Sequence, residues 1–346
     1  MTKYLGYVGT YTKGESKGIY SFVLDSDSSS ITDVKVAAQL ENPTYLTISE
    51  NKQFLYSVVK KDDLGGVSSY SIDSQTGELT LINSQTSAGS PPCHVSAGTE
   101  NKNVFSANYH KGTVESYLLK EDGSLLPPAS VIEHQGSGPD PRQEKSHMHY
   151  AAFTPDEKYV VAIDLGSDKI YTYELINGEL QEKNVLTVKA GSGPRHLVFH
   201  PEYKLAYVMT EFSSEVIVLN YDQENGSFEE RQYISTLPAG FTENNQGSAI
   251  HISSDGKFIY AGNRGHNSIA LFEVNTENGE LQFVEHTSTE GNWPRDFALD
   301  PSEKFIVASN QESSNIVLFA RDETSGRLTL IQSDIKVPDP VCVKFL

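Results

Sequence analysis

The sequence repeats one unit of four short strands about every fifty residues, and this repeat limits the possible folds more than any other feature. A polar turn ending in lysine precedes the second strand of six units, at residues 49–52, 99–102, 155–158, 201–204, 254–257 and 301–304. A glycine turn precedes the fourth strand, at Gly77, Gly123, Gly178, Gly226, Gly279 and Gly326. The apolar runs between these turns are of strand length and rich in β-branched and aromatic residues. Such a repeat is typical of β-propeller blades.

The two ends of the sequence predict how the repeat closes. Units begin near Pro43, Pro92, Ser146, Pro194, Ser248, Pro294 and Pro340, and the last one supplies a single strand. The first forty residues supply the three missing strands, at about 4–10, 18–24 and 34–39. We therefore expect an all-β fold, a seven-bladed β-propeller with four antiparallel strands per blade, whose last blade is closed by the N- and C-terminal strands. The prediction is one domain over residues 1–346, with a β-solenoid or two sandwiches as the alternatives.

Composition excludes several kinds of partner. The formal net charge of −19 argues against nucleic acid, because binding to phosphates requires a basic surface. Cys93 and Cys342 are too few for a disulfide framework and are not spaced as metal ligands, which fits a reducing compartment. No signal peptide and no apolar run long enough to span a membrane are found, so we predict a cytoplasmic protein without a membrane partner. The oligomeric state stays open.

Rare cationic residues gather at one end of the predicted ring. In an up-and-down blade the polar turns and the glycine turns share one end, and the loops of variable length lie at the other end. Arg195, Arg264 and Arg295 fall at the variable end. Histidines at the starts of first strands can converge on the same mouth, and they are His94, His147, His149, His196 and His251. In so acidic a protein, this pattern predicts a site for a small phosphorylated or carboxylated ligand.

Several segments resemble one known family. Residues 193–201 read Gly-Pro-Arg-His-Leu-Val-Phe-His-Pro, and residues 149–156, 248–257, 263–268 and 291–297 carry related motifs. On these segments the chain resembles the lactonase-type seven-bladed propellers along nearly its whole length. The resemblance implies an enzyme, a carboxylic ester hydrolase that converts 6-phospho-D-glucono-1,5-lactone to 6-phosphogluconate in the pentose phosphate pathway. The expected partner is a small sugar lactone, phosphorylated, and no cofactor is expected.

The resemblance also implies the catalytic residues, since His149, Arg195 and Glu211 stand where the family's motifs place them. Our hypothesis makes His149 the general acid or base, Glu211 the residue that orients it or activates water, and Arg195 the stabiliser of the oxyanion. We further expect a set of residues that bind the substrate and its phosphate, consisting of Asn108, His196, Asn263, Arg264, His266 and Arg295.

Other interpretations stay open at this stage. His147 and His149 could chelate a metal from one face of a strand, and the polar residues Asn108, Asp164, Thr210, Asn263 and Asn310 recur at matching positions that could hold Ca²⁺. We favour the simpler view that these residues cap loops, and we predict no metal site. The alternative functions are another lactonase, a muconate-type cycloisomerase of the same fold, and a propeller that binds a ligand without catalysis.

Overall fold

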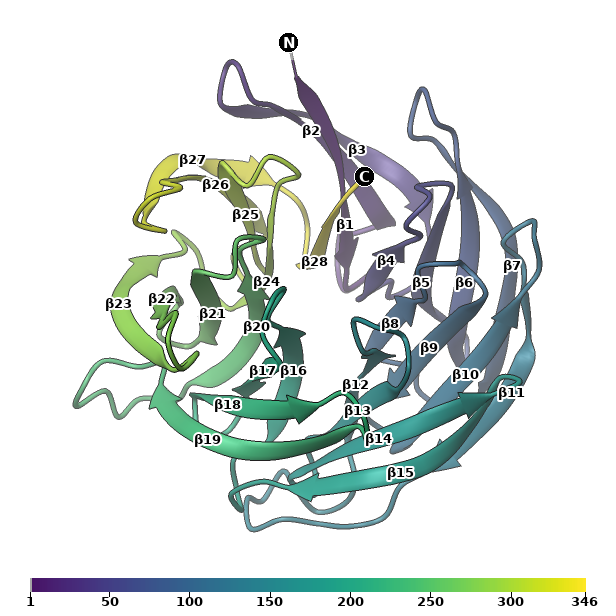
Figure 1. Ribbon diagram of the computed structural model, residues 1–346. Coiled ribbons are helices and arrows are strands. Elements are labelled where there is room, and N and C mark those ends of the chain that lie inside the picture. Colours follow the sequence, from purple (N-terminus) through teal and green to yellow (C-terminus); the bar gives the residue numbers. More distant parts are fainter. Residues whose placement is uncertain (1) are drawn as a thin grey trace.

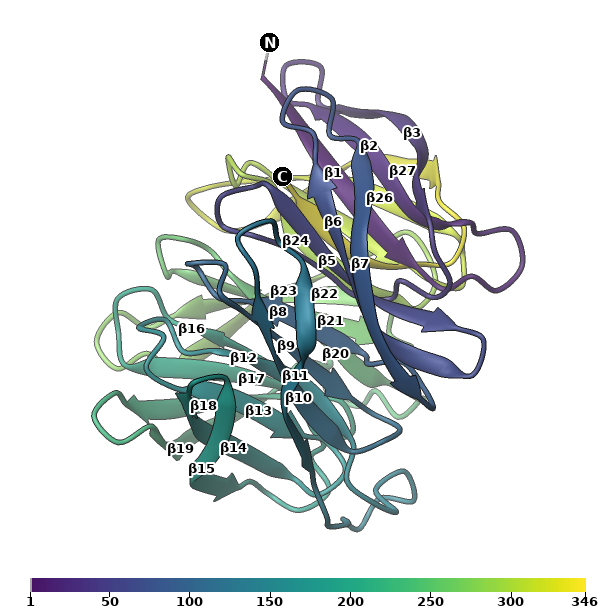
Figure 2. The ribbon, with the colours of Figure 1, turned by 90° about the vertical axis from the view of Figure 1, so that its right-hand side faces the viewer.

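Seven four-stranded antiparallel sheets form a closed ring in the computed structural model, which describes residues 2–346 (Figure 1). The inner, first strands of the blades surround the centre of the ring, and the fourth strands form its outer surface (Figures 1 and 2). The prediction of an all-β seven-bladed propeller is confirmed.

Blades 1 to 3 follow the chain in order. They consist of β4 (Leu46–Ile48), β5 (Phe54–Lys61), β6 (Leu64–Ile72) and β7 (Leu79–Ala88); β8 (His94–Ala97), β9 (Asn103–Asn108), β10 (Thr113–Leu119) and β11 (Leu125–Glu133); and β12 (Met148–Phe153), β13 (Val160–Asp164), β14 (Lys169–Ile176) and β15 (Glu179–Thr187).

Blades 4 to 6 repeat this arrangement. They consist of β16 (Pro194–Phe199), β17 (Leu205–Thr210), β18 (Glu215–Asp222) and β19 (Ser227–Ser235); β20 (Gln246–Ile252), β21 (Phe258–Arg264), β22 (Ser268–Val274) and β23 (Leu281–Ser288); and β24 (Pro294–Leu299), β25 (Phe305–Asn310), β26 (Asn315–Arg321) and β27 (Leu328–Lys336).

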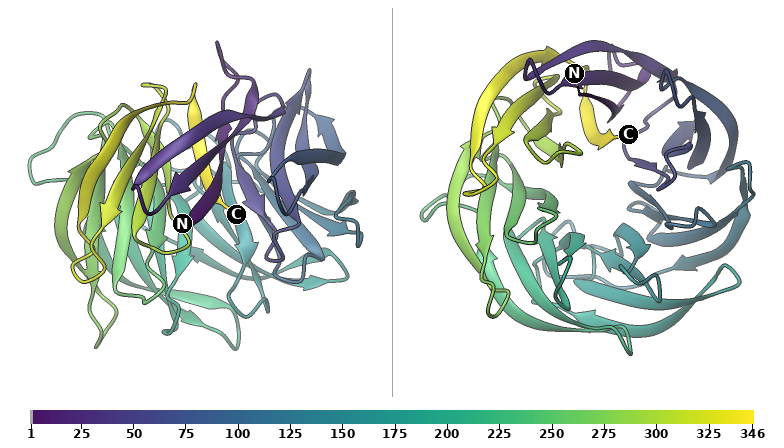
Figure 3. Two further views of the ribbon diagram at one scale, coloured as in Figure 1. Left: turned by 90° about the horizontal axis from the view of Figure 1, so that it is seen from above. Right: turned by 45° about the horizontal axis from the view of Figure 1, so that its top comes forward.

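Blade 7 joins the two ends of the chain, as predicted. Its inner strand β28 (Pro340–Phe345) pairs with β1 (Lys3–Thr10), and β2 (Gly18–Asp25) and β3 (Ser30–Gln39) complete the sheet. The register aligns Val8 with Val343 and Gly6 with Phe345. Figure 3 shows the terminal strands side by side in this blade. The third N-terminal strand begins at residue 30, earlier than the expected 34, because a tight turn at 26–29 starts the pairing directly after β2.

The apolar core lies between the blades. The second and third strands are almost fully buried because a neighbouring sheet covers each of their faces, as in stacked sheets generally. One hydrophobic cluster fills each of the seven junctions between neighbouring blades. At the closing junctions, Val343 and Phe22 pack with Leu318 on one side, and Cys342 and Tyr7 pack with Leu55 on the other.

The glycine turns have a structural purpose that repeats around the ring. Each takes a positive φ, for example 72° at Gly279 and 69° at Gly326, which residues with a side chain rarely adopt. At Gly77, Gly279 and Gly326 the glycine carbonyl also accepts a hydrogen bond from a tyrosine of the preceding blade. Tyr207 Oη donates to Gly279 O at 3.0 Å, and Tyr260 Oη donates to Gly326 O at 2.7 Å. The turns therefore join neighbouring blades.

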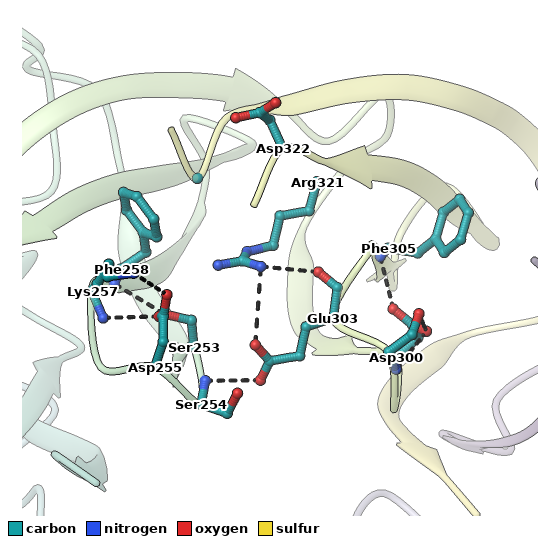
Figure 4. A network of polar contacts seen from close by, with 12 residues as sticks. Ser253, Ser254, Asp255, Lys257, Phe258, Asp300, Glu303, Phe305, Arg321 and Asp322 are labelled. Atoms are coloured by element: carbon teal, nitrogen blue, oxygen red, sulfur yellow. Dashed lines mark hydrogen bonds and ion pairs between the residues drawn. The ribbon is translucent and has the colours of Figure 1, made fainter. Parts of the chain in front are cut away.

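We call this side of the ring the turn end, because it carries the turns between first and second strands and between third and fourth strands. Figure 4 shows one of its junctions, where Arg321 of blade 6 reaches toward blade 5. Arg321 Nε donates to Tyr260 Oη at 2.7 Å, and Nη1 donates to Glu303 O at 3.0 Å. Glu303 in turn accepts a hydrogen bond from Ser254 N at 2.8 Å. The opposite side, with the loops of variable length, is the mouth end.

In the part of the chain that the structure describes, no helix is long and apolar enough to cross a membrane.

Candidate active site

A cavity of about 430 Å³ opens at the mouth end, and we call it the mouth cavity. All seven blades or the loops that follow their strands contribute to its wall, from Tyr11 after β1 to Arg295 on β24. Its size lies within the range of small-molecule sites. Four residues of the predicted site line it, namely His149, Glu211, Arg264 and Arg295. The ring therefore brings together side chains that are far apart in the sequence.

Glu211 joins two arginines in the wall of the cavity. Its Oε2 accepts hydrogen bonds from Arg195 Nε at 3.0 Å and from Arg264 Nη2 at 2.6 Å. The backbone fixes both arginines further, because Arg195 donates to Ser248 O at 2.7 Å and Arg264 donates to Gly247 O at 2.6 Å. All three side chains are buried. Two guanidinium groups on one carboxylate leave this buried cluster with a net positive charge.

The pKa values of the cluster follow from burial and charge together. Burial alone would raise the pKa of Glu211, but the charges of Arg264 and Arg195 outweigh it and hold that pKa below the usual value. Burial lowers the pKa of Arg264 to about 9, with Glu211 opposing the shift. At neutral pH, Glu211 is therefore ionised and Arg264 is protonated.

Gln246 extends the cluster to the long loop before blade 3. With its amide turned so that nitrogen faces Glu211, it donates to Glu211 Oε1 at 3.2 Å and accepts from Arg142 Nη1 at 3.2 Å. The guanidinium of Arg142 stacks 3.9 Å from the ring centre of Phe212. Both carboxylate oxygens of Glu211 thus have protein partners. Among the described residues, the side chains of Glu211 and His149 make no direct contact. The hypothesis that Glu211 orients His149 therefore has no contact behind it.

His149 lines the mouth cavity and has a buried ring nitrogen that no described residue hydrogen-bonds. It is 4% exposed, and its Nδ1 has no hydrogen-bond partner among the described residues. Burial lowers its pKa well below the usual value, and the nearby charges of Arg195 and Arg295 lower it further. The imidazole is therefore neutral at pH 7, which is the form that accepts a proton.

A layer of aromatic rings forms the floor below the cavity. The ring of His94 lies 4.5 Å from Tyr45, 4.6 Å from Tyr150 and 5.4 Å from His196, measured between centroids. His196 also contacts His149 at 5.1 Å. These residues come from the inner strands of blades 1 to 4 or the residues just before them, so they meet only when the ring is closed.

A smaller chamber of about 20 Å³ lies beside this floor and is lined by Arg195, His196, Arg295 and Asp296, among others. His196 is 7% exposed, and its Nε2 has no partner among the described residues. A polar chamber of this volume can hold one water molecule. Arg195 and His196 therefore line this smaller chamber and not the mouth cavity.

The structure does not bring three of the predicted binding residues to the mouth cavity. Asn108 Nδ2 donates to Ser90 O at 2.8 Å, and its Oδ1 accepts from backbone nitrogens of its own loop. Asn263 is fully buried between Thr236 and Asn245. His266 Nδ1 lies 2.7 Å from Ser268 Oγ and packs outside the cavity. These side chains hold loops, so we do not include them in the site.

The recurring polar residues considered as calcium ligands behave in the same way. The oxygens of Asp164 accept from His147 N, Gly166 N and Ser167 Oγ. Thr210 and Asn310 bond within and between their loops. His147 turns its ring onto Tyr109, with centroids 4.0 Å apart. Within residues 2–346, no cluster of three or more His, Cys, Asp or Glu side chains is arranged to hold a metal ion.

Sequence reasoning missed several residues of the cavity wall, including Tyr11, Asn42, Thr44, Lys60, Tyr109 and Gln246. Lys60 stands at the end of a second strand, a position that belongs to the mouth end. Its place in the repeat could have identified it, whereas its residue type could not, because lysine is a common residue of this chain.

The closed ring, with the converging cluster of His, Arg and Glu that line its mouth cavity, is the architecture of a propeller enzyme for a small molecule. A profile of the family described as "Lactonase, 7-bladed beta-propeller" matches residues 5–345. The chain therefore belongs to this family of seven-bladed lactonases.

Individual relatives agree with this assignment. The chain is 57% identical to the 6-phosphogluconolactonase of Bacillus subtilis over 346 residues, which covers 100% of this chain and 99% of the relative. A crystal structure of a protein from Lactobacillus plantarum shares 44% identity with a TM-score of 0.96, covering 100% of both chains. The periplasmic gluconolactonase of Pseudomonas aeruginosa shares 34% identity with a TM-score of 0.95, covering 100% of this chain and 99% of that one.

Proposed function

We propose that this chain is a 6-phosphogluconolactonase, an enzyme that hydrolyses 6-phospho-D-glucono-1,5-lactone to 6-phosphogluconate. One observation carries the proposal: a neutral buried imidazole, His149, lines the same cavity as cations fixed around Glu211, within a lactonase fold. Ester hydrolysis requires a base for water, a cation for the oxyanion and a proton for the leaving oxygen. The cavity contains groups for each task.

His149 acts first as the base in this proposal. A water molecule placed between the imidazole and the lactone carbonyl carbon loses a proton to His149 while its oxygen bonds to that carbon. The carbonyl π electrons move onto the carbonyl oxygen and make it an oxyanion. The depressed pKa of His149 keeps it unprotonated before the attack. The charge that develops on the imidazole is balanced by the negative charge on the substrate.

We assign stabilisation of the oxyanion to Arg264, because Arg264 lines the mouth cavity and Arg195 does not. Arg195 supports it from below through their shared carboxylate on Glu211. A positioned guanidinium stabilises an oxyanion strongly where water is excluded. Glu211 is a positioning residue in this scheme, since both of its oxygens are already bonded.

The second half of the reaction returns the proton. When the oxyanion collapses, the bond between the carbonyl carbon and the ring oxygen breaks, and the imidazolium of His149 protonates the departing alkoxide. The lactone becomes an open-chain hydroxy acid, and His149 is neutral again. No covalent intermediate with the protein is required.

The decisive experiment measures hydrolysis by the purified protein above the spontaneous opening of the lactone in water. The release of acid from 6-phosphogluconolactone follows the reaction directly. We expect a saturable, protein-dependent rate, and a rate equal to the background would reject the proposal.

A second substrate is favoured by the Pseudomonas relative, whose name describes it as a gluconolactonase. Unphosphorylated glucono-1,5-lactone should therefore be assayed in parallel. The cytoplasmic location stays a prediction, which fractionation of cells that express the chain would test.

A further inference from the structure

Arg295 differs from the other arginines around the mouth cavity in having no carboxylate partner. Among the described residues its only side-chain hydrogen bond is a long one, from Nη1 to Gln311 Oε1 at 3.4 Å, and its guanidinium stands 5.4 Å from the ring centre of Tyr11. Arg195 and Arg264 are both bonded to Glu211. Arg295 is half-buried, so its charge is directed into the cavity without being neutralised by the protein.

The wall next to Tyr11 presents further donors. Thr12 N donates to Asn42 Oδ1 at 2.9 Å, and Asn42 N donates to Thr12 Oγ1 at 3.1 Å, which ties the loop after β1 to the loop before β4. The first bond uses the side-chain oxygen of Asn42 and the second its backbone nitrogen, and its Nδ2 donates to no described residue. Thr44 Oγ1 also lines the cavity without a partner in the described part of the chain. Both groups can therefore donate to a ligand oxygen.

Lys60 completes this side of the cavity. Its Nζ donates to Glu41 Oε1 at 2.9 Å, and its backbone nitrogen donates to Glu41 O at 2.9 Å, so the residue is held against the Asn42 loop. An ammonium group has three donors, and the contact with Glu41 uses one of them. Two donors remain, and the side chain lines the mouth cavity.

We propose that this side of the mouth cavity binds the phosphate group of a phosphorylated lactone, and we call it the phosphate rim. The phosphate rim consists of Asn42, Thr44, Lys60 and Arg295. This inference rests on the proposed function and adds which part of the cavity recognises the phosphomonoester. A phosphate monoester carries up to two negative charges and three acceptor oxygens, which match two cations and two neutral donors.

The cluster around Glu211 suits a phosphate dianion less well than the phosphate rim, where the one nearby carboxylate, Glu41, is exposed to solvent. Arg264 and Arg195 already share Glu211, and a dianion placed there would face the ionised carboxylate at close range. The net charge of −19 does not decide the matter, since charges farther than about 8 Å are largely screened at physiological ionic strength. With phosphate on the rim, the lactone end of the substrate lies toward His149 and Arg264.

The test compares Lys60→Met with Lys61→Met. Lys61 is the next residue of β5, is exposed, and points to the other side of the strand. The Lys61→Met substitution therefore removes the same charge without changing a residue that lines the cavity. For each variant, kcat/KM is measured with 6-phosphogluconolactone and with glucono-1,5-lactone. We expect Lys60→Met to lower the preference for the phosphorylated lactone about tenfold, the scale of one charge-assisted hydrogen bond, and Lys61→Met to leave the ratio unchanged.

Inorganic phosphate provides a second measurement that does not depend on turnover. Titration calorimetry should show that phosphate binds the wild type and Lys61→Met equally, and binds Lys60→Met about tenfold more weakly. An unchanged substrate ratio together with unchanged phosphate affinity in Lys60→Met would overturn the phosphate rim while leaving the lactonase proposal intact. A wild type that binds phosphate at the rim but hydrolyses neither lactone would instead overturn the proposed function.

Discussion

At the turn end of the ring, Arg321 is buried between blades 5 and 6, and at the mouth end Arg264 is buried between blades 4 and 5. Both guanidinium groups donate to a backbone carbonyl. Arg321 lies near Glu303 of its own blade, and Arg264 lies near Glu211 of the neighbouring blade. Arg321 has Glu303 at 4.0 Å and donates to the hydroxyl of Tyr260. Arg264 shares its glutamate with a second arginine and lines an open cavity.

This comparison shows that the two ends of the ring use the same residue types differently, for packing at the turn end and for the candidate site at the mouth end. At the turn end, one cation meets one anion within repeated turns, and most of its hydrogen bonds join neighbouring strands and blades. At the mouth end, loops of variable length bring more cations than anions to one place, and the excess charge faces the cavity. The same residue types thus serve packing or catalysis according to whether their charges are balanced.

The largest effect should come from His149→Gln at the mouth end. We expect kcat/KM to fall about 10²- to 10⁴-fold, the usual range for loss of a general acid–base group. The melting temperature serves as the check on folding. His200 at the turn end offers the matched control, because its ring packs on Tyr203 and its Nε2 donates to Gly256 O, away from the residues that line the cavity. Equal loss of activity in His200→Gln would break the comparison.

Glu211→Gln should cost both stability and activity. It leaves two buried guanidinium groups without their anion, and breaking a buried ion pair costs about 3–5 kcal/mol in the free energy of unfolding. Denaturant titration and steady-state kinetics would measure the two losses. Because Glu211 is assigned a positioning role, the shape of the pH–rate profile should persist at the reduced rate. Loss of the acidic limb of that profile would make Glu211 the base.

Arg321→Met should reduce stability alone. The side chain loses charge-assisted hydrogen bonds to Tyr260 and Glu303, each worth about 1.5–3 kcal/mol, and partly regains apolar packing against Phe258. We expect a lower denaturation midpoint and unchanged kcat and KM. A change in KM would show that the turn end communicates with the cavity and that the separation of the two ends is incomplete.

The smallest effect concerns acid stability. Burial lowers the pKa of His94 to about 3, from a usual value of 6.5, and also lowers the pKa values of His149 and His196. Below pH 6.5 the unfolded chain binds more protons than the folded chain, so stability falls as the pH falls toward the folded pKa. One such histidine changes the slope by at most about 1.4 kcal/mol per pH unit.

The matching variant is His94→Leu. It should show a shallower loss of unfolding free energy between pH 6.5 and pH 4.5, whatever its stability at pH 7. Denaturant titrations at several pH values supply the slopes. Identical slopes for the wild type and the variant would mean that His94 is charged in the folded protein.

The repeat predicted the ring because strand pairing within a blade depends on local features, namely a turn residue every few positions and apolar strands between them. Residue order alone also placed Arg264, Arg295 and His149 at the mouth end. Side-chain direction was not accessible in this way. Asn108 and Asn263 stand at mouth-end positions, yet their amides turn back into their loops. The pairing of Glu211 with Arg264 depends on contact between separate blades, which no local pattern encodes.

The pairing of β1 with β28 determines when the ring can close during synthesis of the chain. The partners of Gly6 and Val8 lie on β28, which is synthesised after the other six blades, so those blades can form while the ring is still open. During that interval β1 offers an unpaired edge that another nascent chain could occupy, which is a known route to aggregation. A contact across nearly the whole chain is also slow to form. Removing residues 340–346 would make this transient state permanent.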